Sequence, residues 1–276
     1  MRRVGVIAGS GFYEMEGIRE KGSKRVTSPF GDPSDRYRIY ELSGTEVIFL
    51  SRHGSPHRIP PHEINYRANI SGFREMGVER IYGIHAVGGM NRGMKPGDIV
   101  IPDQIVDLTH SRAATFYSGS DVVHIDFTTP YCDDLRALLF ASGRRGGIEL
   151  RESGTYVCVN GPRLETAAEI RAFAGMGGDV VGMTGMPEAS LARELAICFA
   201  GIAVVTNYAA GISEKRLTTR EVVETMKVAM GRIRALVRGA LEIMPENRAC
   251  ECAKALDDAR MQDVRGHPLL SDGEDS

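Results

Sequence analysis

The chain has 276 residues, 42% of them hydrophobic, which is enough to bury the core of one sizeable domain. A net charge of −2 provides no basic field for nucleic acid. The first apolar run is too short for a secretory signal, and the longest one, residues 195–205, is too short to span a bilayer. Five scattered cysteines do not match a secreted disulfide framework. We therefore expect a cytoplasmic protein with no membrane or nucleic-acid partner.

Strand and helix patterns alternate along the chain. Short apolar runs predict strands at residues 4–8, 37–42, 45–50, 81–87, 98–101, 155–159, 180–183 and 201–207. Helical spacing predicts helices over residues 65–76, from 166 to 173, over 187–196, and from 218 to 241. This order predicts an α/β fold, a mixed central β-sheet flanked by helices, in a single domain of residues 1–244. The charged residues 245–276 predict a separate, partly disordered tail.

A glycine turn, Gly9-Ser10-Gly11, follows the first expected strand. A dinucleotide fingerprint would need a third glycine at Glu14 and an acidic ribose partner about twenty residues later in a βαβ unit, and the segment does not offer them. Two interpretations remain. The turn is either an anion nest, in which backbone N–H groups and the Ser10 hydroxyl face a phosphate, or a plain structural turn. Beside Arg52 and Thr184, the phosphate interpretation is favoured.

Arg52 and His53 stand where the strand over residues 45–50 ends, the place where ligands bind in α/β sheets. The Arg fork suits phosphate oxygens and the His adds a further hydrogen bond, although an isolated Arg here would be a solvated loop cation. His57 and His62 follow nearby. No cysteine or carboxylate accompanies these histidines at ligand spacing, so we expect no metal site.

Three polar groups stand at the ends of later apolar runs: the Glu165 carboxylate, the Thr184 hydroxyl and the Asn207 carboxamide. A base-binding pocket that also holds phosphate needs such groups. A carboxylate at position 165 would equally suit a helix N-terminus without any function.

The order and spacing of these motifs, from about Val4 to Leu241, resemble the trimeric purine nucleoside phosphorylase and methylthioadenosine phosphorylase family. The resemblance implies a homotrimer or a dimer of trimers that uses inorganic phosphate as co-substrate and needs no cofactor. It implies phosphate contacts from Ser10, Arg52, His53, the Ala86 backbone N–H and Thr184. It implies base contacts from Leu164, Glu165, Asn207 and Ala209, and sugar contacts from Met183, Thr219 and His124 of a neighbouring subunit. The chemistry would fall to Asn207, Glu165 and His53.

Two positions bear on the choice of base. Adenine-preferring methylthioadenosine phosphorylases have Asp where this chain has Asn207 and Ala209, so the resemblance implies 6-oxopurine nucleosides: methylthioinosine, inosine or guanosine. It is nearest to methylthioinosine phosphorylases. His85 stands where the family has Asn or Thr, and both a contact with phosphate and a lining role are open. A methylthioadenosine phosphorylase, a hydrolytic nucleosidase of related fold and a non-catalytic purine-binding module are the alternatives.

The cysteines divide into two sets. Cys250-Glu251-Cys252 resembles the C-terminal CxC of thermophilic archaeal relatives, where a disulfide can form, and two incidental thiols are the alternative. Cys132, Cys158 and Cys198 lie in or beside apolar segments, and we expect them to be small buried side chains.

Overall fold

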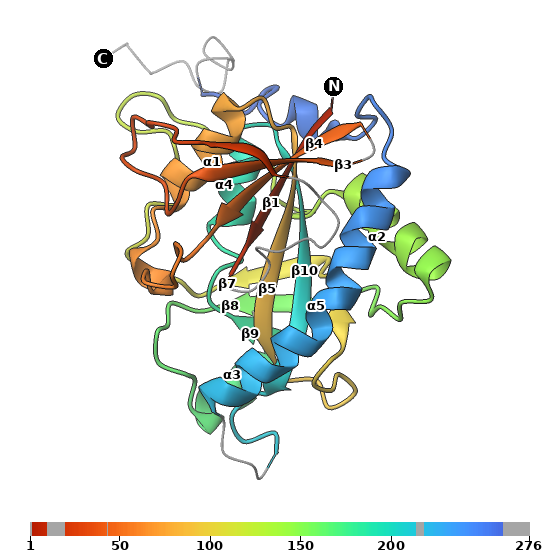
Figure 1. Cartoon of the computed structure of the whole chain (residues 1–276). Coiled ribbons are helices and arrows are strands. Elements are labelled where there is room, and N and C mark those ends of the chain that lie inside the picture. The colour runs from red at the N-terminus through yellow and green to blue at the C-terminus, as the bar shows by residue number, and fades with distance from the viewer. Residues whose placement is uncertain (1, 10–19, 43, 214–217, 262–276) are drawn as a thin grey trace, which may run out of the picture.

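The computed structural model describes residues 2–9, 20–42, 44–213 and 218–261. Within these ranges ten strands form one mixed sheet (Figure 1). The strands are β1 (Arg2–Ala8), β2 (Glu20–Lys24), β3 (Tyr37–Leu42), β4 (Thr45–Ser51), β5 (Arg80–Gly89), β6 (Ile99–Val100), β7 (Gln104–Asp107), β8 (Thr155–Cys158), β9 (Val180–Gly182) and β10 (Cys198–Tyr208). The helices are α1 (Tyr66–Glu75), α2 (Asp133–Gly146), α3 (Ala167–Gly175), α4 (Glu188–Glu194) and α5 (Thr219–Glu242), with 3₁₀ turns at Pro61–Glu63 and Glu251–Lys254.

Strand β5 is the centre of the sheet. The strand order is β2-β3-β4-β1-β5-β9-β8-β7, and β10 pairs with both β5 and β6. Strands β4, β1, β5 and β10 run parallel to one another, so their carboxyl ends lie at the same edge. In α/β sheets ligands bind at that edge.

Helices cover both faces of the sheet, which makes three layers (Figure 1). One apolar cluster joins β1, β5 and β10 to α2 and α5 through Val6, Ile202 and Val237. The other joins the same strands to α1 and α4 through Ile7 and Val205. Successive residues of a strand enter opposite clusters because side chains alternate across the sheet. This explains why the strand runs are apolar throughout.

The expected α/β fold is confirmed, and every strand and helix predicted from the sequence is present with ends within a few residues of those expected. The helix caps explain several of these ends. Asn65 accepts a hydrogen bond from Ala68 N at the start of α1, and Thr166 forms a capping box with Glu169 at the start of α3. Three elements were missed: β2, the short edge strand β7 and α2. Helix α2 did carry a signal, two acidic residues in its first turn and a left-handed glycine, Gly147, directly after it.

The domain boundary expected after residue 244 stays a prediction. Residues 245–261 lie against the sheet, where Arg80 Nη2 donates to Glu246 O and Arg248 Nη1 to Ala196 O, and Cys252 belongs to the core. No helix in the described residues is long and apolar enough to cross a membrane.

Candidate active site

A gap in strand pairing beside β5 forms the floor of the candidate site. Strand β1 pairs with β5 only as far as Gly83, and β9 pairs with it from Gly88 onward. Ala86 lies between these points and is the single exposed residue of β5. The carbonyl of Ile84 faces the gap, because Arg52 reaches it. Backbone groups of alternate residues share an edge of a strand, so the Ala86 N–H also faces this gap.

Arg52 fills the inner end of the gap, and its side chain is 1% exposed. Its Nε and Nη2 donate to the two carboxylate oxygens of Glu188 at 2.6 and 2.9 Å. Nη1 donates to Ile84 O, and Nη2 also donates to Ile7 O. Of the five N–H donors of a guanidinium, these four contacts leave one on Nη1. From the sequence we expected the guanidinium group of Arg52 to bind phosphate. In the structure its Nε and Nη2 bind Glu188 instead.

His53 lies beside Gly9, with its ring stacked on His57 at a centroid distance of 4.2 Å. Its Nδ1 is 2.8 Å from Ile59 O. A carbonyl only accepts, so Nδ1 carries the proton. Burial, and then the charge of Arg52, lower the pKa of His53 to about 4. The ring is therefore neutral at pH 7, and its Nε2 is an acceptor.

The side chain of His85 contacts the side chain of Thr184. The ring is buried, and Nδ1 is 2.9 Å from the Thr184 hydroxyl oxygen. Burial, followed by the charge of Arg52, lowers the pKa of His85 well below its usual value, so the ring is neutral. The Tyr156 ring packs against it edge-on. His85 is therefore a buried residue that contacts Thr184 directly, and a contact of its own with phosphate stays a prediction.

Asn207 lies near the carboxyl end of β10, at an irregularity in the sheet. The pairing with β5 shifts between Val205 and Asn207, so Thr206 is an extra residue, and such bulges re-aim side chains. Asn207 Nδ2 donates to Tyr208 O at 2.9 Å, and Thr206 Oγ1 donates to Asn207 Oδ1 at 2.8 Å. Because a carbonyl only accepts, the first contact fixes which side of the amide is NH₂. One hydrogen of that NH₂ is left for a ligand.

Comparisons with known proteins place this arrangement in a family. The model of the phosphorylase superfamily matches residues 3–242. The chain belongs to this superfamily. It is 50% identical to the probable S-methyl-5'-thioinosine phosphorylase of Thermodesulfovibrio yellowstonii over 93% of this chain and 97% of that protein. It is 49% identical to the 6-oxopurine nucleoside phosphorylase of Pyrococcus furiosus over 93% of this chain and 98% of that one. The fold matches methylthioadenosine phosphorylase from Schistosoma mansoni in complex with adenine, with a TM-score of 0.90, 30% identity, and coverage of 95% and 100%.

In this member of the phosphorylase superfamily, Glu165 precedes the cap of α3 and is half-buried. Burial raises the pKa of its carboxyl group. Leu164 beside it is 49% exposed. The loop that carries both residues packs on Met183, since a Cβ at Gly161 would lie 2.4 Å from Met183 Sδ. Met183, the expected sugar contact, therefore touches the start of the loop that carries Leu164 and Glu165.

Ala209 borders the same glycine as Asn207, because a Cβ at Gly88 would lie 3.3 Å from Asn207 Nδ2 and 3.4 Å from the Ala209 Cα atom. Ala209 is buried, and its cluster includes Val157, Ile170 and Val181. His124 is exposed near the opposite end of β10, where its N–H donates to Ala259 O. Ser10 and the side chain of Thr219 are outside the part of the chain that the structure describes.

Glu188, the partner of Arg52, was not predicted from the sequence. It is fully buried at the start of α4, directly after Pro187. Its sequence signal was a single acid in an otherwise small and apolar stretch. A charge in such a place needs a buried counter-charge.

Proposed function

We propose that this phosphorylase cleaves 6-oxopurine nucleosides in the cytoplasm. Phosphate displaces the base from methylthioinosine, inosine or guanosine and gives the free purine and the sugar 1-phosphate. The observation that carries this proposal is the fixed orientation of the Asn207 amide, which leaves one of its N–H groups for a ligand. A 6-oxopurine offers acceptors at O6 and N7, so it suits that donor. No cofactor takes part.

The remaining N–H of Asn207 would stabilise the departing base. Breaking the N-glycosidic bond leaves positive charge on the sugar and negative charge on the purine. A donor at N7 or O6 stabilises that developing negative charge, and a preoriented donor acts without reorganisation. Glu165 would accept a hydrogen bond from N1–H. Its half-buried carboxylate has lost part of its hydration and gains from such a donor.

Phosphate would occupy the gap beside Ala86. The Thr184 hydroxyl, the Ala86 N–H and the remaining N–H of Arg52 are donors for it, and the charge of the Arg52–Glu188 pair is already balanced. The neutral His53 offers an acceptor at Nε2. It suits the single O–H of hydrogen phosphate. A phosphate fixed below C1′ stabilises the sugar cation and then captures it.

Phosphate dependence tests the proposed reaction. Purified enzyme with methylthioinosine or inosine should release hypoxanthine only when inorganic phosphate is added, and the sugar should appear as its 1-phosphate. Equal release in phosphate-free buffer would identify a hydrolytic nucleosidase. Tight binding with no release would identify a purine-binding module.

The contact between His85 and Thr184 leads to a separate prediction. His85→Ala removes the partner that orients the Thr184 hydroxyl. We expect the KM for phosphate to rise about five- to tenfold, as for the loss of one hydrogen bond, with kcat and the preference among bases nearly unchanged. His85→Asn should recover much of the loss, because an amide can also bond to the hydroxyl. An unchanged phosphate KM in folded His85→Ala would exclude this positioning role.

We also propose that the active species is a trimer or a dimer of trimers in which His124 of one subunit covers the sugar of its neighbour. In its own chain His124 lies at the opposite end of β10 from Asn207, which supports a role in another subunit. Asn207→Ala chains and His124→Ala chains should each be poorly active. Mixed by subunit exchange, they should regain activity, because some pockets then contain both intact residues. Mixed oligomers, verified by mass, that stay as inactive as their parents would rule out a shared pocket.

A further inference from the structure

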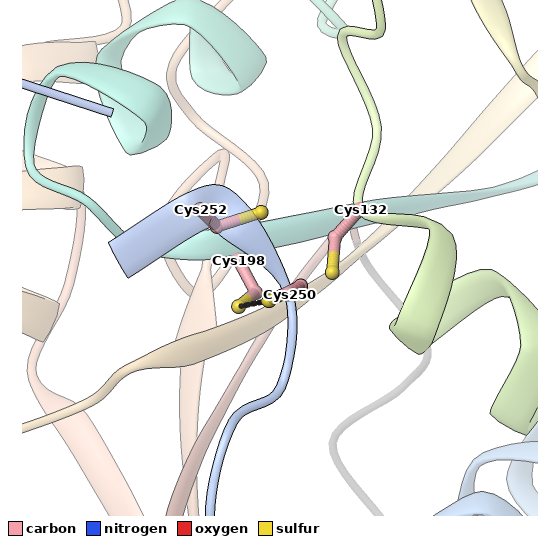
Figure 2. Close-up of side chains that lie close together, drawn as sticks. All are labelled: Cys132, Cys198, Cys250 and Cys252. Atoms are coloured by element: carbon pink, nitrogen blue, oxygen red, sulfur yellow. Dashed lines mark hydrogen bonds between the residues drawn. The ribbon is translucent and has the colours of Figure 1, made fainter. Parts of the chain in front are cut away.

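Four of the five cysteines meet at one point of the fold, far apart though they are in the sequence. They are Cys132 before α2, Cys198 at the start of β10, and Cys250 and Cys252 in the segment after α5. Figure 2 shows their four side chains gathered in one place, with the sulfurs of Cys198 and Cys250 in contact. All four Sγ atoms lie within 4.8 Å of one another. Cys158 lies elsewhere, where its Sγ contacts Met186.

The sulfur positions suit a tetrahedral metal ion. With Zn–S bonds of about 2.3 Å, the sulfurs of a tetrathiolate zinc site lie about 3.8 Å apart. The Sγ atoms of Cys198 and Cys250 are 3.3 Å apart, and no pair in the cluster is separated by more than 4.8 Å. The sulfur separation of about 3.8 Å in a tetrahedral zinc site lies between these two distances. Small rotations of the side chains would therefore complete the site.

The surroundings also suit a closed structural site. Cys132, Cys198 and Cys252 are buried and Cys250 is half-buried. Four thiolates fill the coordination sphere of zinc and leave no position for water or substrate. The cluster lies at the amino end of β10, whereas Asn207 is at the carboxyl end of the same strand. A metal here would hold the chain together and take no part in the cleavage of nucleosides.

We infer that Cys132, Cys198, Cys250 and Cys252 bind one structural zinc ion. On binding, four thiols lose their protons to solvent and four Zn–S bonds form, with no change of oxidation state. The ion ties the segment after α5 to the sheet and to the start of α2. That segment also pairs with the chain near His124, through the bridge between Val123 and Arg260.

Disulfides are the competing outcome. The CxC resemblance suggested a bond between Cys250 and Cys252, yet here the Cys250 sulfur contacts Cys198. A separation of 3.3 Å is far longer than the roughly 2.05 Å of a disulfide, and all five cysteines are free thiols. Disulfides and a tetrathiolate metal site use the same sulfurs and exclude each other. Thiol counting therefore separates them.

The test uses the full-length protein purified without reductant or chelator. Elemental analysis should find about one zinc per chain. Denaturation with a chelator should then expose five titratable thiols per chain, whereas one or two disulfides would leave three or one. Reconstitution with Co²⁺ should give the charge-transfer and visible bands of a tetrahedral cobalt thiolate. Removal of the metal should lower Tm.

Matched variants give the control. Cys132→Ser or Cys252→Ser should lower the zinc content at least severalfold, while Cys158→Ser, a buried cysteine outside the cluster, should retain it. If the cluster variants fail to fold, the metal content, thiol count and Co²⁺ spectrum of the unmodified chain still show whether the cysteines bind a metal ion. Fewer than five thiols, or a chain that neither contains zinc nor takes up Zn²⁺ or Co²⁺, would overturn the inference.

Discussion

Replacement of Arg52 by Met should destabilise the enzyme by about 3–5 kcal/mol, the cost of leaving a buried carboxylate without its partner. Glu188 has no exposed surface, and two charge-assisted hydrogen bonds from Arg52 satisfy it. Glu188→Leu should cost a similar amount, since it leaves the guanidinium unpaired. The measurement is thermal or urea unfolding at one fixed chain concentration, because assembly also affects apparent stability.

The double variant separates stability from function. Arg52→Met with Glu188→Leu removes both charges, so it should be much less unstable than the sum of the two single variants. It should fold and still bind nucleoside, yet cleave it poorly because a phosphate donor is lost. Arg220→Met breaks an exposed Arg–Glu pair and should cost less than about 1 kcal/mol. If Arg52→Met were as mild as this control, or if the single effects simply added, the buried pair would not stabilise the fold as proposed.

The second large effect is expected at the base. In Asn207→Asp an oxygen replaces the NH₂ that now lies 2.9 Å from Tyr208 O. Two acceptors then face each other, and the carboxylate also meets O6 of a 6-oxopurine as acceptor against acceptor. We expect kcat/KM for inosine to fall about 10²- to 10³-fold, as for the loss of other charge-stabilising donors. Adenine nucleosides offer a 6-amino donor, so they should lose much less.

Asn207→Ala is the control for this change. It removes the donor without adding an acceptor, so it should slow both classes of nucleoside and leave their ratio closer to that of the unmodified enzyme. The further change Ala209→Asp should add to the preference for adenine but reduce stability, because position 209 is surrounded by Val157, Ile170 and Val181. If Asn207→Asp kept the preference of the unmodified enzyme for 6-oxopurine over adenine nucleosides, Asn207 would not determine which base is bound.

The fold and the rough position of the site could be predicted because both depend on local patterns. Apolar strand runs and helix caps locate the elements. Arg52 follows β4, and Ala86 and Asn207 lie toward the carboxyl ends of β5 and β10, strands that turn out to be parallel. Strand β2 was missed because it is mostly exposed and lacks apolar alternation.

The contacts of the site residues could not be predicted, because each depends on a partner distant in sequence. Arg52 and Glu188 are 136 residues apart, and His85 and Thr184 are 99 apart. The cysteine cluster likewise requires the packing of three separate segments. The direction of the Asn207 amide depends on a bulge that no sequence pattern marks.

The central claim, a phosphorylase specific for 6-oxopurines, is tested most directly by one ratio. The kcat/KM of the unmodified enzyme is measured for methylthioinosine and for methylthioadenosine at saturating phosphate. These substrates differ only at the base, where Glu165 and Asn207 would meet two mismatched groups in adenine, each costing about 1–3 kcal/mol. The expected ratio is therefore about 10² to 10⁴ in favour of methylthioinosine. Equal values, or a preference for methylthioadenosine, would contradict the assignment.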